Sequence, residues 1–547
     1  MLISCQSVLN FSKKSNLAPL MFYSSKFTDT IKNNQLKPFN EIPGPKRYGF
    51  LGPLNDALTT GDPKNLHKMI HKMHELYGPI FKIKLGKIDS IFTSSCENMR
   101  AIFLYEGKHP KHPVPPAWAY FNKKYNCKRG LFFMDDNEWL HYRKMLNPLL
   151  LQDFNQYKAP IEMACDKFIN GIMIKSDAAA KREDKNLRDT EFIELIDLEA
   201  RLYRWSIDVV LSVMLGTSSD KIIPNTLIEE FSKVVHKIFE FSSHLQSIPP
   251  QIADFFQLNA WKNFVRVVNE SLKLGNEITE NAIGNCPRNS SGLLNQLKDK
   301  QFNDDEIKRL FIDLIIAAGD TTSFATQWML YLVAKNEDVQ RRIRKNLVND
   351  LEMETDLIKG AVREALRLYP PATFIGRFMQ EDGNLNDFRI PKGTLALLSL
   401  YTAGRDPNHF SSPNDFIPER WLRKDNSSQN EIFKPQASMP YAIGVRSCIG
   451  RKIANYQMHT LLTKLLLKYE MKLLNCNEID STMKMVITPA ESIRIGLKVD
   501  NRDFLYKIIA EKKKLIVNNS FFMNEKNNGH RQRDKFESKQ NKNPRST

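Results

Sequence analysis

A single cysteine, Cys448, stands between two glycines just before a predicted helix, in the segment Ser438–Ala454. Gly444 and Gly450 lack a Cβ and let backbone approach a flat group, while Arg446 offers a planar fork for a carboxylate. Backbone N–H groups and the positive end of the following helix favour a thiolate. A lone cysteine is most often a small buried hydrophobe. The spacing Gly-x-Arg-x-Cys-x-Gly instead predicts a haem iron bound through sulfur. A thiolate bound to the iron promotes O–O cleavage.

The charge of the chain is concentrated at its ends. The 547 residues carry a formal net charge of +17, of which residues 506–547 hold +7 and residues 1–40 hold +4. The central part therefore holds only +6, so we expect no nucleic-acid partner, although a local basic patch for an acidic protein remains open. Seven cysteines without a Cys-x-x-Cys pair predict neither a disulfide framework nor a zinc site and favour a reducing compartment.

The two ends differ in composition from the body of the chain. Residues 1–35 contain four lysines, many hydroxyl side chains, one acid and no apolar run long enough to span a bilayer. This composition predicts a mitochondrial presequence, with a merely disordered N-terminus as the alternative. Residues 506–547 are rich in Lys, Asn, Gln and Arg and predict a disordered basic C-terminal extension. The folded domain is therefore expected over 36–505.

The longest helical pattern covers Leu310–Ala334, and Asp313 and Asp320 within it argue for a buried protein helix rather than a membrane span. A second helix is predicted over Leu357–Tyr369 because Pro370 and Pro371 follow it. Phe388–Ser399 reads as strand, turn and strand, and residues 451–473 show helical apolar periodicity.

Within the long helix, Asp320 and Thr321 place an acid beside an alcohol. In a dry pocket a carboxylate and a hydroxyl can relay protons through water to a reacting oxygen. Thr321 can also bond back to a carbonyl and widen the helix locally. The alternative is a core helix that contains threonine and a solvated aspartate.

These segments together resemble the signatures of the cytochrome P-450 family, in the family's order and over about residues 36–505. Tyr441 stands where the family usually has Phe in the cysteine loop, and Ala318 stands where it usually has Gly before the acid. The resemblance implies a mainly α fold with small β-sheets, an α-helical prism around haem b (iron protoporphyrin IX). It also implies a haem-thiolate monooxygenase that uses molecular oxygen, with Cys448 as the iron ligand.

The resemblance assigns further residues to this site. Glu364 and Arg367 are three apart on a helix and can pair, which alone predicts only an ordinary surface ion pair. With Arg420 they match the family's buried Glu-Arg-Arg network. Trp139 and Arg143 are four apart on one helix face and match the family's Trp-x-x-x-Arg pair of haem propionate donors.

Arg377 follows the proline break, where the family often places another propionate partner. Arg446, Gly444 and Gly450 complete the implied haem contacts.

Lys359 and Arg363 lie on adjacent turns of the helix that carries Glu364, where a charged face is most often simply solvated. The mitochondrial branch of the family uses basic residues at these positions to dock an adrenodoxin-type ferredoxin, which an NADPH-dependent reductase supplies with electrons. This implies a protein of the mitochondrial inner membrane, peripheral on the matrix side. Phe239–Trp261 is rich in aromatic residues and fits either a contact with the membrane surface or a lid on the substrate chamber.

Three segments resemble the insect ecdysteroid 2-hydroxylases of that branch: Phe374–Phe378, Leu397–Phe410 and Ala442–Cys448. This resemblance implies hydroxylation of a steroid, 2-deoxyecdysone to ecdysone, whereas the residues by themselves indicate only an apolar substrate. Two alternatives stay open. A mitochondrial xenobiotic hydroxylase would share the motifs and differ in its pocket, and a non-enzymatic haem-binding sensor would need neither Asp320 and Thr321 nor a docking face.

Overall fold

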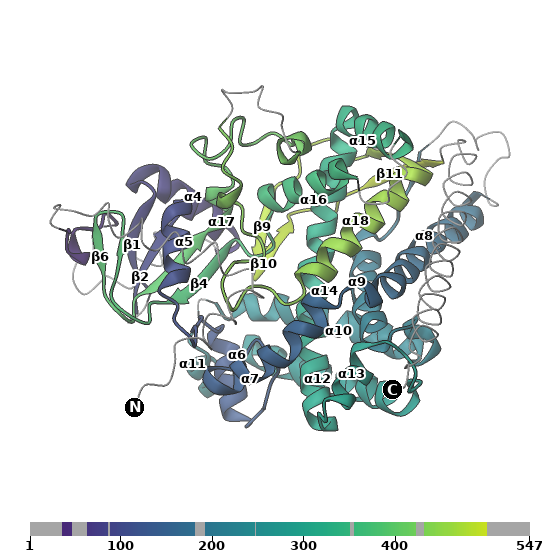
Figure 1. Cartoon of the computed structure of the whole chain (residues 1–547), viewed down its shortest axis with the longest axis horizontal. Helices are drawn as coiled ribbons and strands as arrows, with labels where there is room; N and C mark the ends of the chain where they lie inside the picture. Colours follow the sequence, from purple (N-terminus) through teal and green to yellow (C-terminus); the bar gives the residue numbers. More distant parts are fainter. Residues whose placement is uncertain are drawn as a thin grey trace, which may run out of the picture.

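The computed structural model describes residues 36–45, 63–85, 88–180, 192–246, 248–349, 355–422 and 432–499. The predicted presequence, residues 1–35, and the predicted extension, residues 506–547, lie outside these ranges. Helices make up most of the described chain, and the strands gather into small separate sheets (Figure 1). The expected mainly α fold with small β-sheets is confirmed.

The helices of the described chain, in order, are α4 (Leu66–Tyr77), α5 (Cys96–Leu104), α6 (Pro116–Lys124), α7 (Asp136–Asn147), α8 (Lys158–Ala180), α9 (Leu198–Leu215), α10 (Asn225–His244), α11 (Pro250–Phe255), α12 (Asn259–Asn285), α13 (Leu293–Asp299), α14 (Asp304–Lys335), α15 (Glu337–Asn349), α16 (Asp356–Leu368), α17 (Leu400–Ala403) and α18 (Arg451–Lys468). A π-helical turn, Pro148–Gln152, follows α7. Among the described residues, no helix combines the length and apolar character needed to cross a bilayer.

The largest sheet has the strand order β1 (Ile80–Leu85), β2 (Ile88–Thr93), β7 (Leu395–Ser399) and β4 (Phe374–Phe378). It lies at one end of the molecule, beside α4, α5 and α17 (Figure 1). The β2 and β7 strands run parallel, whereas the two outer pairings are antiparallel. The smaller sheets pair β5 (Gly383–Leu385) with β6 (Phe388–Ile390), β9 (Ser481–Lys484) with β10 (Val486–Pro489), and β11 (Ile495–Val499) with both β3 (Ile193–Glu194) and β8 (Tyr469–Leu473).

The long helix α14 begins where the sequence supplies a capping box. The Asn303 side chain accepts from the Glu306 backbone N–H, and the Glu306 carboxylate accepts from the Asn303 N–H. From Phe311 onward most of its side chains are buried, and it packs against α9 and α12 in the largest apolar cluster. Asp313 is buried as expected. Hydrogen bonds from Arg129 and the Gly130 N–H satisfy its buried carboxylate. The predicted helix over Leu310–Ala334 is thereby confirmed.

One prediction needs correction, and another is confirmed with a pairing that the sequence did not indicate. The helical pattern of residues 451–473 ends at Lys468, and Tyr469–Leu473 continues as β8 because these residues pair with β11. The strands of Phe388–Ser399 both exist, but they do not pair with each other. The first, β6, pairs with β5, and the second, β7, enters the large sheet between β2 and β4. The turn between them therefore joins two sheets.

Candidate active site around Cys448 and helix α14

The loop before α18 presents Cys448. The Cys448 N–H donates to the Tyr441 carbonyl at 2.8 Å, and the Ser447 N–H donates to the Gly444 carbonyl at 3.2 Å. Gly444 has φ +80°, and a Cβ built there would lie 2.2 Å from Glu106 Oε1. Only glycine fits this position without displacing Glu106. The Tyr441 hydroxyl donates to Asn455 Oδ1 at 3.0 Å.

The thiol of Cys448 lies in a recess. Its side chain has exposed surface, yet burial among protein atoms is the largest influence on its pKa and raises it. The Gly450 N–H and the guanidinium groups of Arg143 and Arg451 act in the opposite direction. These groups act in the predicted direction, although burial is the larger influence on the thiol in the chain by itself. A metal cation at the sulfur would reverse this balance.

Cationic and donor groups gather beside this recess. Arg446 Nη2 donates to Asp135 Oδ1 at 2.8 Å, and its guanidinium lies 4.6 Å from the Trp139 ring centroid. Arg143 donates to the carbonyl of Ser447, next to the cysteine. The structure therefore brings Trp139, Arg143 and Arg446 to the same loop.

Three buried nitrogens of this group are unsatisfied. Arg143 Nε, Arg446 Nε and His112 Nε2 have no hydrogen-bond partner within the described ranges of the chain. Arg446 also contacts the other ring nitrogen of His112, and burial lowers the pKa of this histidine to about 3, so its ring is neutral. Buried cations with free N–H groups fit an anionic ligand such as a pair of carboxylates.

Arg377 has a buried partner that the sequence did not indicate. Its Nε donates to Glu106 Oε2 at 2.8 Å, and both side chains are buried. Glu106 Oε1 in turn accepts from the Val445 N–H at 3.2 Å. Burial raises the pKa of Glu106 although Arg377 opposes this shift. Arg377 therefore supports the cysteine loop through Glu106, a residue that carries no sequence motif.

Asp320 and Thr321 on α14 have different surroundings. Thr321 is half-buried, and its hydroxyl donates to the carbonyl of Ala317. Ala317 is exposed, although most of this helix is buried. Asp320 is buried and faces α10, where His236 Nδ1 lies 3.5 Å from its Oδ1. Burial raises the pKa of Asp320 to about 6. The two side chains are neighbours in sequence, but no direct hydrogen bond joins them. The helix is α-helical throughout, so the expected widening at Thr321 is not seen.

The carboxylate of Glu364 is the centre of a buried network. It accepts from Arg367 at 2.8 and 2.7 Å, from Arg420 Nε at 2.8 Å and from Trp421 Nε1 at 2.8 Å. The guanidinium of Arg367 also donates to the carbonyls of Gly404, Pro413 and Asp415. This network ties α16 to the segment that leads toward the cysteine loop, and the sequence spacing of Glu364 and Arg367 reflects it.

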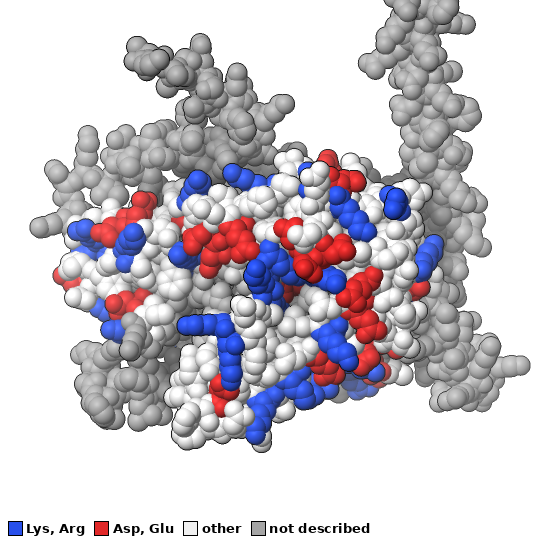
Figure 2. All heavy atoms as spheres, turned by 90° about the horizontal axis from the view of Figure 1, so that it is seen from below, with Lys and Arg blue, Asp and Glu red and all other residues white. Residues whose placement is uncertain are grey.

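The more exposed side of α16 carries two basic residues. Arg363 is exposed, and its guanidinium lies 6.0 Å from the Trp421 ring centroid. Lys359, one turn earlier, is half-buried and lies 3.7 Å from Asp356 Oδ1. Elsewhere, Figure 2 shows a face of the molecule on which basic and acidic side chains lie interspersed in small groups.

Comparison with known proteins gives the family. Residues 42–497 match the family described as cytochrome P450. This chain belongs to the cytochrome P450 family. A protein of Drosophila melanogaster named "Cytochrome P450 315a1, mitochondrial" is 39% identical over 466 residues, which cover 84% of this chain and 88% of the relative. The mitochondrial cholesterol side-chain cleavage enzymes of horse and cattle are each 26% identical. These matches cover 85% and 86% of this chain and 90% and 92% of the relatives.

As a cytochrome P450, the chain is a monooxygenase whose cofactor is haem b. The residues around Cys448 fit this group. The thiol lies accessible in a recess, Gly444 leaves the loop without a side chain there, and unpaired N–H groups of Arg143, Arg446 and His112 suit the two haem carboxylates. The P450 motifs did not indicate His112 or Glu106, since both lie outside them and contact the loop only in the folded chain.

Proposed function

We propose that this P450 hydroxylates a steroid and converts 2-deoxyecdysone to ecdysone. The observation that carries the proposal is the set of segments that resemble the insect ecdysteroid 2-hydroxylase called Shadow. Two of them lie side by side, because β4 (Phe374–Phe378) pairs antiparallel with β7, where Leu397–Phe410 begins. The relatives named for cholesterol side-chain cleavage act on a sterol, which supports a substrate of this class.

In this proposal Cys448 binds the haem iron, and Trp139, Arg143, Arg377 and Arg446 hold the propionate side of the haem. Gly444 and Gly450 let the loop approach the ring. The haem supplies the activation of dioxygen, from which one oxygen atom enters a C–H bond of the steroid.

Thr321 and Asp320 supply protons from the α14 side. The network of Glu364, Arg367 and Arg420 holds the cysteine-loop side of the fold and takes no part in the chemistry.

Electrons are proposed to come from an adrenodoxin-type ferredoxin and its NADPH-dependent reductase, with Lys359 and Arg363 as the docking residues. We place the protein in the mitochondrion, peripheral on the matrix side of the inner membrane, because the relatives are named mitochondrial. The segment 250–258 is the proposed membrane contact. Phe255 and Phe256 there are 81% and 67% exposed, and Lys262 is exposed nearby.

The experiment is reconstitution of the purified holoprotein with ferredoxin, reductase and NADPH on 2-deoxyecdysone. Mass spectrometry should detect ecdysone, with one added oxygen. A Cys448→Ser protein is the matched control and should form none. If the reduced protein binds carbon monoxide normally but adds no oxygen to 2-deoxyecdysone, the substrate proposal fails. Turnover of diverse drugs in its place would favour a xenobiotic hydroxylase.

A further inference from the structure

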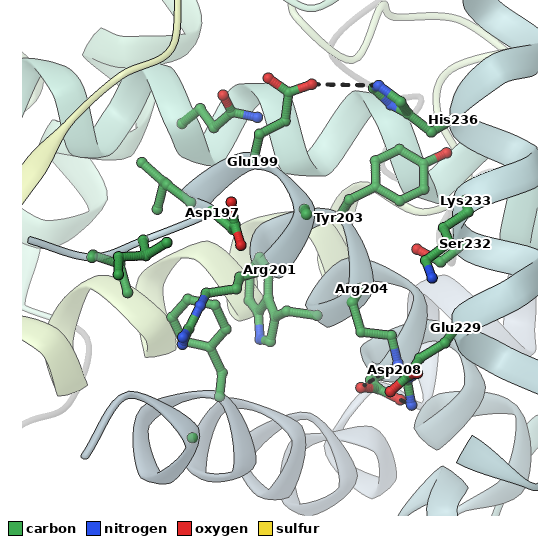
Figure 3. A pocket seen from close by; sticks show the side chains of 18 of the residues that line it. Asp197, Glu199, Arg201, Tyr203, Arg204, Asp208, Glu229, Ser232, Lys233 and His236 are labelled. Atoms are coloured by element: carbon green, nitrogen blue, oxygen red, sulfur yellow. Dashed lines mark hydrogen bonds and ion pairs between the residues drawn. The ribbon is translucent and has the colours of Figure 1, made fainter. Parts of the chain in front are cut away.

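His236 connects the surface of the protein to the buried Asp320. It lies on α10, and its two ring nitrogens face opposite acids: Nε2 is 3.4 Å from Glu199 Oε1, and Nδ1 is 3.5 Å from Asp320 Oδ1. Figure 3 shows Glu199 and His236 pointing toward each other across the pocket wall. The Asp320 side chain is 1% exposed, whereas those of His236 and Glu199 are 37% and 42% exposed. The imidazole therefore spans the boundary between solvent and interior.

Several polar atoms around this contact are unsatisfied. Both carboxylate oxygens of Asp320, Nδ1 of His236 and the hydroxyl of Tyr203 are buried and have no hydrogen-bond partner in the described part of the chain. They are close together, because the rings of Tyr203 and His236 lie 5.1 Å apart, and a Cβ on Gly319 would lie 2.8 Å from the Tyr203 hydroxyl. Buried polar groups that converge without partners are usually bridged by water. The arrangement thus suits a short proton path at Asp320.

The path opens into a solvent-accessible pocket of about 1210 Å³ between α8, α9 and α10. Its lining includes Glu199, Tyr203 and His236, and also Gln327 of α14. Asp197, Arg201 and Arg204 contribute charged groups to the lining (Figure 3). Water can therefore reach the outer edge of His236.

The charges that act on His236 come from three directions. Glu199 lies on α9 and Asp320 on α14, and both raise the pKa of the imidazole, with the contact to Asp320 as the largest cause. Lys484 on β9 and burial lower it. The aromatic neighbours, Tyr203 and Phe324, bring no charge near neutral pH. The two acids thus favour a charged imidazolium at the edge of the pocket, which can act as a proton donor.

We propose that His236 is the proton inlet of this P450, carrying protons from the pocket to Asp320. The imidazolium gives its Nδ1 proton to the Asp320 carboxylate and remains as the neutral ring with the proton on Nε2. A flip of the ring then turns the bare Nδ1 toward the pocket and Nε2–H toward Asp320, and a proton from pocket water or from protonated Glu199 binds Nδ1 and restores the imidazolium. This inference rests on the proposed role of Asp320 in proton delivery but not on the identity of the steroid.

The test compares His236→Gln with His244→Gln, an exposed histidine near the end of the same helix. Each holoprotein is reconstituted with ferredoxin, reductase and NADPH, and oxygen uptake, peroxide release and hydroxylated product are measured. A parallel arm uses iodosobenzene, which delivers an oxygen atom and needs no proton from the protein. We expect His236→Gln to reduce oxygen-driven hydroxylation about ten-fold or more and to divert oxygen uptake to peroxide. The rate of iodosobenzene-driven hydroxylation should change less than two-fold in His236→Gln. The His244→Gln protein should match the unsubstituted protein in both arms.

The pH profile separates a relay from a structural role. In the unsubstituted protein the oxygen-driven rate should fall as pH rises through the raised pKa of His236, and this fall should disappear in His236→Gln. An unchanged rate and pH profile in His236→Gln overturns the proposal, as does an equal loss in both arms. If the unsubstituted protein adds no oxygen to 2-deoxyecdysone in either arm, the substrate proposal fails. The partition of oxygen uptake between water and peroxide then still decides the role of His236.

Discussion

Glu364→Gln tests the buried network most sharply, because the change keeps the shape of the side chain and removes its charge. The carboxylate accepts two hydrogen bonds from Arg367 and one each from Arg420, Trp421 and the backbone N–H of Ile417. The side chains of Glu364 and Arg367 have no exposed surface, and that of Arg420 is 6% exposed. A glutamine would leave two guanidinium groups buried without a counter-charge and would turn an amide N–H₂ toward other donors. We expect a loss of about 3–5 kcal/mol in the free energy of unfolding.

The matched control is Glu419→Gln. Glu419 also pairs with an arginine, Arg342, at 2.7 Å, but their side chains are 33% and 53% exposed. Solvent screens such a pair, so its loss should cost about 0–1 kcal/mol. Urea titrations of both holoproteins, followed by circular dichroism and by haem absorbance, give the two shifts in midpoint. Equal shifts, or a cost below about 1 kcal/mol for Glu364→Gln, would refute the reasoning.

Two further predictions concern the cysteine loop and the basic face. Gly444→Ala should weaken haem binding by about 1–3 kcal/mol. The alanine would be strained at φ +80°, and its Cβ would lie only 2.2 Å from Glu106 Oε1, so the loop would have to shift. The control is Gly393→Ala, because Gly393 has φ +85° and open space around it, so this change shows the effect of backbone strain alone. Haem transfer to apomyoglobin should become faster in Gly444→Ala and not in Gly393→Ala. Changing both Lys359 and Arg363 to Glu should slow ferredoxin-driven reduction about ten-fold at low salt and flatten its salt dependence, while the iodosobenzene arm stays unchanged. Lys472→Glu on β8 is the control, and equal slowing there would contradict a docking role for α16.

The sequence predicted those features that depend on residues close to one another along the chain. The apolar pattern of α14 is local, and the proline pair after Tyr369 marks the end of α16, so both helices were predictable. Glu364 and Arg367 are three apart on one helix, so their contact followed from helix geometry. Residues 469–473 were wrongly predicted as the end of a helix. An apolar pattern of five residues fits either a helix end or a strand, and only the pairing with β11 decides between them.

The surroundings of the site depend on contacts between distant segments. Asp320 was predictable as a candidate acid, but its partner His236 comes from α10, 84 positions earlier, and no motif marks it. Glu106 and His112 likewise reach the cysteine loop from more than 300 positions away. Burial of Cys448 adds an influence on its pKa that the sequence does not show. The loop around Cys448 supplies positive groups, yet removal of the thiol from water outweighs them, and this balance is visible only in the folded chain.

The account depends most directly on the bond between Cys448 and the haem iron. Electron paramagnetic resonance and absorption spectra of the purified holoprotein, with and without carbon monoxide, report the atom that binds the iron opposite the oxygen site. We predict a sulfur ligand that Cys448→Ser abolishes and that Cys127→Ser leaves unchanged. A nitrogen ligand in the unsubstituted holoprotein, or a sulfur signature that survives Cys448→Ser, would contradict the account.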